Sequence, residues 1–117
     1  MGKLSTHVLD TMHGAPAQGV RIDLYRIDGE QRVAIGQAVT NHDGRCDAPL
    51  LQGDALQKGV YELVFHAGDY FAARGVSLEQ PRFVDRIALR FGVARPDQNY
   101  HVPLLVTPWT WSTYRGS

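Results

Sequence analysis

The stretch that decides the fold, "VRIDLYRI" (residues 20–27), alternates apolar and polar side chains. In an extended chain Val20, Ile22 and Leu24 lie on one face, and the side chains between them lie on the other. Alternation with a period of two is typical of a strand that is buried on one side only. The sequence therefore predicts a half-buried β-strand here.

The same pattern recurs on both sides of this strand. The run "QRVAIGQAVT" (31–40) follows the turn residues Asp28-Gly29-Glu30, so the two runs are expected to form a hairpin. The segment "NHDGR" (41–45) predicts a second turn, because Asp-Gly is a strong turn signal. "GVYELVF" (59–65) and "RIALRF" (86–91) indicate two more strands.

The chain ends add three strand candidates, "LSTHVLDT" (4–11), "YHVPLLV" (100–106) and "TWSTYR" (110–115). Pro103 cannot donate a hydrogen bond to a neighbouring strand, so it predicts an edge or irregular strand. Only "GDYFAARG" (68–75) departs from the pattern, and it predicts a short helix of about two turns. About seven short strands separated by turns favour an all-β sandwich.

Composition narrows the functional classes. The chain has 117 residues, enough for one domain over residues 1–117, and 44% of them are hydrophobic. Twelve basic residues balance twelve acidic ones, which argues against nucleic acid as the partner. A net charge of zero does not oppose self-association. The longest apolar runs are only a few residues, so no membrane span is expected.

Cys46 is the only cysteine, which rules out a disulfide within the chain and favours a reducing compartment, the cytoplasm. A lone cysteine is usually inert packing, and no nucleophile motif or phosphate loop surrounds it. Its neighbour Arg45 is either a solvent-facing charge or a planar donor fork for a carboxylate, urea or imide edge. Spacing leaves both interpretations open.

Five histidines are the other candidates. His13 and His42 lie in glycine-rich loops, where a solvated side chain is expected, and His66 ends a strand without distinctive neighbours. His7 and His101 lie inside strand patterns, where a packed and hydrogen-bonded histidine is the commonest case. The irregular gaps between the histidines, with no second cysteine, predict no metal site.

The carboxyl end, "WTWSTYRGS" (109–117), mixes aromatic, cationic and small polar residues up to the last position. A flexible tail is usually poor in Trp and Tyr. The composition therefore predicts that this end is docked, against another subunit.

These motifs together resemble the 5-hydroxyisourate hydrolase branch of the transthyretin-like family. The resemblance is carried by "LSTHVLDT", "DGR", "YHVPLLV" and the terminal "STYRGS", and it spans residues 4–117. The terminal Tyr-Arg-Gly-Ser is the hallmark of this branch. The chain departs from many relatives at Trp109-Thr110-Trp111, where they carry Tyr-Gly-Tyr.

The resemblance implies a transthyretin-like β-sandwich of two four-stranded sheets with one short helix. It also implies a homotetramer, a dimer of dimers, with active sites in a channel between the dimers. The implied reaction is hydrolysis of the N1–C6 amide bond of 5-hydroxyisourate, giving 2-oxo-4-hydroxy-4-carboxy-5-ureidoimidazoline on the way from urate to allantoin. The resemblance implies no metal and no cofactor.

The resemblance also assigns roles to particular residues. The catalytic residues that it implies are His7, Arg45, His101 and Ser117, and the substrate-binding residues are His7, Arg45, Tyr114 and Arg115. Histidine titrates near neutral pH and can serve as base or acid. We expect His101 to activate water, His7 to shuttle a proton to N1, and Arg45 to stabilise the charge that develops at the carbonyl. Which histidine is the base stays open.

Two other classes stay open at this stage. The first is a transthyretin-like protein that binds a small apolar ligand without catalysis; two histidines and an arginine are poor choices for an apolar pocket. The second is a structural sandwich with no ligand, which fold alone never excludes.

Overall fold

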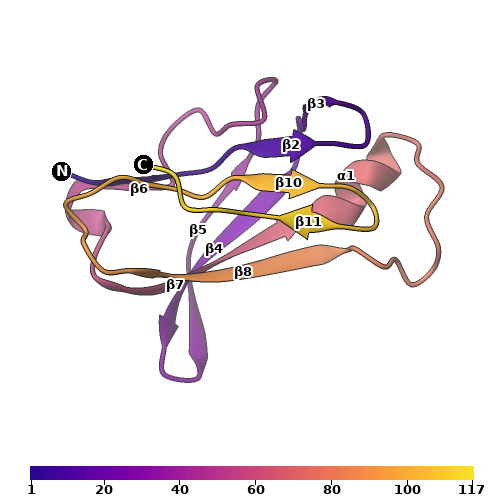
Figure 1. The fold of residues 1–117 in the computed structure, drawn as a ribbon. Helices are drawn as coiled ribbons and strands as arrows, with labels where there is room; N and C mark the ends of the chain where they lie inside the picture. Colours follow the sequence, from indigo (N-terminus) through magenta and orange to yellow (C-terminus); the bar gives the residue numbers. More distant parts are fainter.

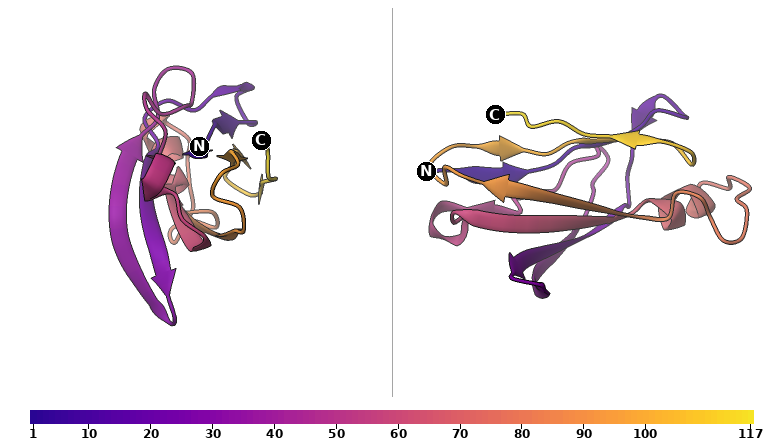
Figure 2. Two further views of the ribbon diagram at one scale, coloured as in Figure 1. Left: turned by 90° about the vertical axis from the view of Figure 1, so that its left-hand side faces the viewer. Right: turned by 60° about the horizontal axis from the view of Figure 1, so that its bottom comes forward.

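Two layers of β-strands face each other across one apolar core (Figures 1 and 2). The computed structural model describes residues 1–117. One layer is an antiparallel sheet in the order β5-β4-β7-β8. Its strands are β4 (Arg21–Asp28), β5 (Gln31–Val39), β7 (Gly59–His66) and β8 (Arg86–Val93).

The half-buried strand and its hairpin are as the sequence predicts. Val20, Ile22 and Leu24 are at most 2% exposed. The chain reverses at Gly29, whose φ of +62° lies in the left-handed region that favours glycine. The far end of the β4–β5 hairpin extends beyond the rest of the sandwich, which leaves the edge strand β5 largely exposed (Figure 1).

The second layer contains the two chain ends and carries the predicted site. It has short strands in two assigned groups, β6-β1-β9 and β11-β10-β2-β3. They are β1 (Lys3–Ser5), β2 (Val8–Asp10), β3 (Ala15–Pro16), β6 (Leu51–Gln52), β9 (Tyr100–His101), β10 (Leu104–Val106) and β11 (Trp111–Ser112). Strands β1 and β9 run parallel, as do β2 and β10.

The structure has three assigned sheets, of three, four and four strands, whereas two four-stranded sheets were expected. The division falls beside Pro103, which has no N–H to give to its neighbour. Hydrogen bonds still cross the gap, because the Val102 N–H donates to the Ser5 carbonyl at 2.8 Å and the Leu104 N–H to the His7 carbonyl at 2.9 Å. The two groups therefore form one continuous layer. Pro103 interrupts it, as expected of an irregular strand, but lies inside the layer and not at its edge.

The helix α1 (Ala67–Ala73) begins one residue before the segment predicted to be helical, residues 68–75, and otherwise lies within it. It covers the end of the sandwich opposite the two termini (Figure 1). Phe71 and Tyr70 from α1 join the core. A single 3-10 turn, η1 (Gly53–Ala55), precedes β7. Neither helix is long and apolar enough to cross a membrane.

Candidate active site

His7 lies in the short link between β1 and β2, on the outer face of the layer. Leu4, Thr6 and Val8 are buried against the core, so the residues between them, Ser5 and His7, are turned the other way and are half-buried. The period-two pattern thus leaves the imidazole at the surface, where a ligand can reach it.

The predicted second turn brings Arg45 to His7. Gly44 has a φ of +74°, and a Cβ there would lie 2.4 Å from the Val8 carbonyl oxygen, so the turn requires glycine. The Val8 N–H donates to the Gly44 carbonyl at 2.8 Å, which ties the turn to β2. Arg45 then pairs with His7 in an isolated antiparallel bridge, and Arg45 is exposed.

The His7 ring is held by the same turn. Its Nε2 lies 2.9 Å from the Asp43 carbonyl oxygen. A carbonyl can only accept, so Nε2 must carry the hydrogen. Neutral His7 therefore keeps its lone pair at Nδ1.

His101 lies in β9 beside both β1 and the tail. Its Nδ1 is 2.9 Å from the Ser5 hydroxyl oxygen. Its backbone exchanges two hydrogen bonds with Gly116, at 3.1 and 2.7 Å. A Cβ on Gly116 would meet His101 Cβ at 3.2 Å and Cδ2 at 3.3 Å, so the tail packs closely against the histidine.

The charges of Arg45 and His7 are close enough to His101 to affect its pKa. Burial lowers the pKa of His101, and the nearby positive charges of Arg45 and His7 lower it further. His101 is consequently neutral at neutral pH, the state in which an imidazole can accept a proton. The structure thus brings His7, Arg45 and His101 together, although 38 residues or more separate His7 from the other two in the sequence.

The tail lies along its own chain. The Thr113 hydroxyl donates to the Pro103 carbonyl at 2.7 Å, and Gly116 pairs with His101. Tyr114 nevertheless stays 61% exposed, and Ser117, next to the Gly116 bridge, is exposed too. The substrate and catalytic roles of these two residues stay predictions.

Arg115 is not brought to the cluster. Its guanidinium lies over the Tyr100 ring at 4.3 Å from the centroid and donates to the Asn99 carbonyl at 3.0 Å and the Gln98 side chain at 3.2 Å. Tyr100 is buried on the side of β9 opposite His101. Within one chain Arg115 anchors the tail, and its contact with substrate stays a prediction.

Sequence reasoning missed a second polar cluster at the end of β2. Asp10, whose carboxylate is buried, accepts hydrogen bonds from the Tyr70 hydroxyl at 2.7 Å and from the His13 backbone N–H at 2.9 Å. The His13 ring also contacts this carboxylate, although His13 is exposed, as its loop position predicts. Burial favours a higher pKa for Asp10, but these hydrogen bonds outweigh it and the net pKa is lowered. Burial and the same carboxylate raise the pKa of Tyr70 to about 12.

His66 also has charged neighbours that the sequence did not signal. Its Nε2 lies 2.8 Å from an Asp23 carboxylate oxygen, and its Nδ1 lies 3.7 Å from Asp69. These contacts join β7, β4 and α1. His42 is exposed, as its loop position predicts.

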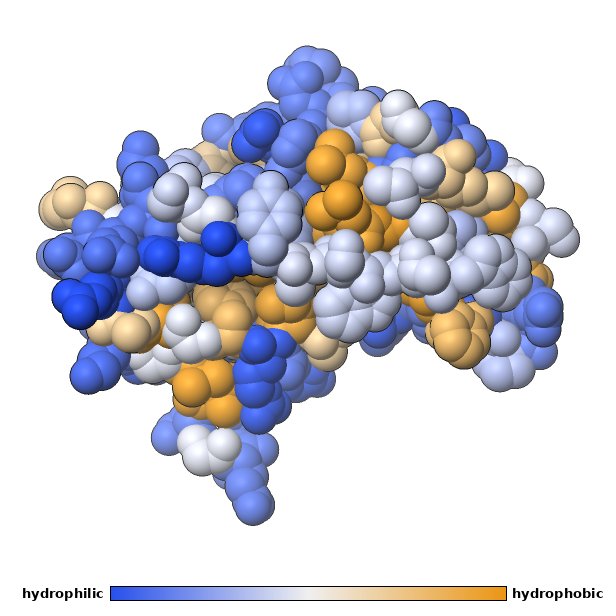
Figure 3. All heavy atoms as spheres, viewed as in Figure 1, coloured by the Kyte–Doolittle hydropathy of each residue, from blue (hydrophilic) through white to orange (hydrophobic).

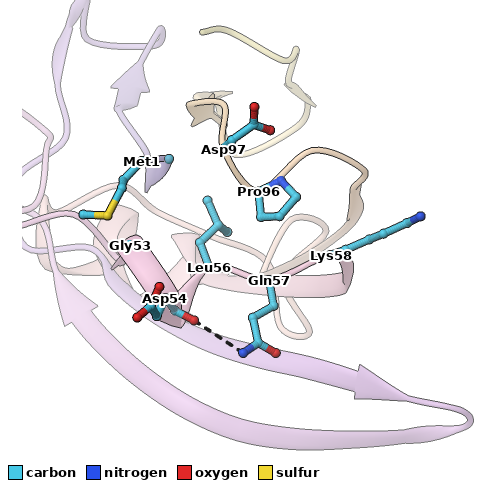
Figure 4. Close-up of a pocket in the computed structure, with 9 residues that line it drawn as sticks. Met1, Gly53, Asp54, Leu56, Gln57, Lys58, Pro96 and Asp97 are labelled. Atoms are coloured by element: carbon cyan, nitrogen blue, oxygen red, sulfur yellow. Dashed lines mark hydrogen bonds between the residues drawn. The ribbon is translucent and has the colours of Figure 1, made fainter.

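A surface hollow of about 530 Å³ lies at the end with the two termini and contains no predicted site residue (Figure 4). Two carboxylates and one lysine, Asp54, Asp97 and Lys58, lie around it. The His7–Arg45–His101 cluster lies instead on an open face. Over β10 and β11 that face carries apolar and near-neutral side chains (Figure 3), and the exposed aromatics of the tail segment are Trp109, Trp111 and Tyr114.

Comparison with known proteins places these features in a family. A model described as the HIUase/Transthyretin family matches residues 4–116. A Pseudomonas aeruginosa protein named 5-hydroxyisourate hydrolase is 58% identical over 117 residues, covering 100% of this chain and 93% of the relative. A Ralstonia nicotianae protein of the same name is also 58% identical, covering 100% of both chains.

Solved structures agree on the fold. A Klebsiella pneumoniae 5-hydroxyisourate hydrolase superposes with a TM-score of 0.81 at 37% identity over 100% of both chains. An (S)-allantoin synthase gives a TM-score of 0.94 at 49% identity, covering 99% of this chain and 44% of that longer chain. A sea bream transthyretin in complex with thyroxine gives 0.86 at 23% identity over 97% of this chain and 94% of that one, a likeness of fold alone. The chain therefore belongs to the HIUase/Transthyretin family.

Proposed function

We propose that this chain hydrolyses 5-hydroxyisourate by opening its N1–C6 amide bond, with His7, Arg45 and His101 as the reacting groups. The observation that carries the proposal is the convergence of these three side chains on one open face beside the tail. The relatives named for this activity are 58% identical over the full length of the chain. Residues 1–117 act as one domain.

His101 is the general base in this proposal. Its Nδ1 is engaged by Ser5, which leaves Nε2 for the attacking water. Because its pKa is lowered, the ring is neutral and able to accept the proton of that water at neutral pH. The water oxygen then forms a bond to C6.

Arg45 and His7 complete the step. The guanidinium of Arg45 stabilises the negative charge on the C6 oxygen without changing its own protonation state. When the C6–N1 bond breaks, protonated His7 gives its Nδ1 proton to N1 and becomes neutral, with Nε2–H still donating to Asp43. Water is thereby added across the amide: its oxygen stays on C6, and His101 holds the proton that it took from the water. The new carboxyl group at C6 loses its proton to solvent and becomes a carboxylate, and His101 returns its proton through solvent to His7, which restores both histidines for the next turnover. Tyr114 and Arg115 bind the substrate, and Ser117 orients a histidine.

Assembly completes the site. In one chain Arg45 and Tyr114 are exposed, so the face around them needs a cover to exclude water from the reaction. The exposed Trp109 and Trp111 and the zero net charge suit association of copies of this chain. The proposed assembly is the homotetramer, a dimer of dimers.

The proposed location is the cytoplasm. Cys46 is a free cysteine, and burial, with the Asp47 charge, raises its pKa, which keeps it as a neutral thiol. An unpaired thiol suits a reducing compartment.

Addition of the protein to urate and urate oxidase tests this function. We expect ultraviolet absorbance of the 5-hydroxyisourate intermediate to decay faster in proportion to protein concentration. A decay rate equal to that without the protein would contradict the proposal and favour a non-catalytic, transthyretin-like binding protein.

A further inference from the structure

Three residues form a row across neighbouring strands on the outer face of the second layer. Ser5 pairs with His101 in the parallel β1–β9 register, and His101 pairs with Gly116 in the antiparallel bridge. Residues paired in this way point to the same face of a sheet. The His101 ring therefore lies between a serine hydroxyl and a glycine.

The two neighbours restrict the ring in different ways. Gly116 has no side chain, so its backbone lies directly against the ring, where a Cβ would come within 3.3 Å of Cδ2. Ser5 places its hydroxyl 2.9 Å from Nδ1. The ring is thus held against rotation from one side, and one of its nitrogens is occupied from the other.

The Ser5 hydroxyl also affects which ring nitrogen of His101 carries the hydrogen. A hydroxyl can donate or accept, but protonated His101 can only donate, so the hydroxyl accepts from Nδ1–H in the charged state. If the hydroxyl also accepts in neutral His101, the hydrogen lies on Nδ1 and the lone pair on Nε2, and this is the arrangement that the reaction requires. The partner of one ring nitrogen sets which tautomer is present.

We propose that Ser5 is a positioning residue for this reaction, which holds Nδ1 of His101 and so keeps the Nε2 lone pair directed at the substrate. This inference rests on the proposed function, because it needs His101 to be the base. Ser5 itself contacts neither substrate nor water in the proposal. It acts through the ring.

The test is Ser5→Ala, compared with Ser5→Thr, which keeps a hydroxyl at the same place. We expect kcat to fall about tenfold to a hundredfold in Ser5→Ala with KM nearly unchanged, as is typical when a residue that orients a reacting group is lost. Ser5→Thr restores most of the lost rate. Thr11→Ala is the matched control, because it too removes a hydroxyl beside this layer, one that donates to the Val106 carbonyl and does not touch a histidine.

Two further measurements distinguish a positioning role of Ser5 from simple loss of structure in Ser5→Ala. In Ser5→Ala the charged His101 loses an acceptor, so its pKa falls further and the acidic limb of the kcat profile moves to lower pH. The ¹⁵N shifts of the His101 ring move from the Nδ1–H tautomer toward a mixture of tautomers. Unchanged kcat and unchanged ring shifts in Ser5→Ala would overturn the proposal.

The ring shifts are measured without substrate, so they distinguish the two possible failures. An inactive wild type with a Ser5-dependent tautomer would contradict the proposed function alone. An active wild type whose ring shifts do not depend on Ser5 would contradict the positioning role alone.

Discussion

Two polar clusters begin only three residues apart in the sequence, at His7 and at Asp10, and they are built in opposite ways. The Asp10–His13–Tyr70 cluster is closed, because its buried carboxylate takes its hydrogen bonds from groups of its own chain. The His7–Arg45–His101 cluster is open, because Arg45 is exposed and each ring keeps one nitrogen free of the contacts that hold it. Polar groups that use all their hydrogen bonds on one another stabilise the fold. Groups that are held in place but keep a donor or acceptor unused can bind a ligand.

The pKa directions follow this division. In the closed cluster, hydrogen bonds lower the pKa of Asp10 in spite of burial, so the carboxylate stays charged. In the open cluster, burial and two cationic neighbours lower the pKa of His101, so the imidazole stays neutral. The first arrangement holds a charged carboxylate that stabilises the fold, and the second holds a neutral imidazole that can accept a proton.

Deletion of residues 114–117 should give the largest effect on the open cluster. The deletion removes the Gly116 bridge to His101 and the groups proposed to meet the substrate. We expect turnover to be lost, while the sandwich stays folded because the core is formed by residues elsewhere. Turnover and the circular dichroism spectrum of the shortened chain check this, and retained activity would refute the role of the tail.

Arg45→Gln should lower kcat by on the order of a hundredfold to a thousandfold, the usual loss when a group that stabilises a developing oxyanion is removed. Arg45 makes no ion pair in the fold, so the melting temperature should stay near that of the wild type. Steady-state kinetics and thermal unfolding measure the two effects separately. A full-rate variant would exclude Arg45 from the reaction.

Asp10→Asn should affect the closed cluster instead. Loss of the charged acceptor leaves the Tyr70 hydroxyl and the His13 groups with a weaker partner, which should cost about 1–3 kcal/mol of unfolding free energy. We expect kcat at a temperature where the variant is folded to stay near wild type. Denaturant unfolding, with kinetics as the comparison, is the measurement, and a selective fall in kcat would contradict the division into two clusters.

The same variant predicts a pH dependence. Because the pKa of Asp10 is lowered on folding, its stabilising effect is present above the unfolded pKa of about 3.9 and is lost as pH falls through the folded pKa. The stability difference between wild type and Asp10→Asn should therefore shrink as pH falls below about 4. A difference that stayed constant over this range would exclude a charged Asp10.

The smallest expected effect is that of salt on the open cluster. Burial is the largest cause of the lowered His101 pKa, and salt does not remove it; salt screens only the charges of Arg45 and His7. The acidic limb of the kcat/KM profile should therefore move slightly to higher pH with added salt. Profiles at low and high ionic strength measure the shift, and movement to lower pH would contradict this assignment of causes.

Local patterns predicted much of the fold. Alternation identified β4, and the Asp28-Gly29 turn identified its hairpin, because both signals lie within a few residues. The short helix predicted for residues 68–75 was also confirmed, although it begins one residue earlier, at Ala67. The division of the second layer at Pro103 was not predicted as an interior break, because one sequence does not show which strands will flank it.

The candidate site depended on contacts between distant parts of the chain. Spacing alone left Arg45, His7 and His101 as separate candidates, and the family resemblance joined them. Neither pattern nor resemblance signalled Ser5 or the Asp10–Tyr70 contact, since their partners lie 96 and 60 residues away. Hydrogen bonds of this kind follow from strand register, which is fixed by the whole fold.

The most direct test of the central claim, that the open cluster performs the hydrolysis, is the turnover of 5-hydroxyisourate by His7→Ala and His101→Ala across pH. Both variants should stay folded and lose about a hundredfold or more in kcat, and His101→Ala should lose the acidic limb that the wild type shows. Near-wild-type rates in both folded variants would contradict the account.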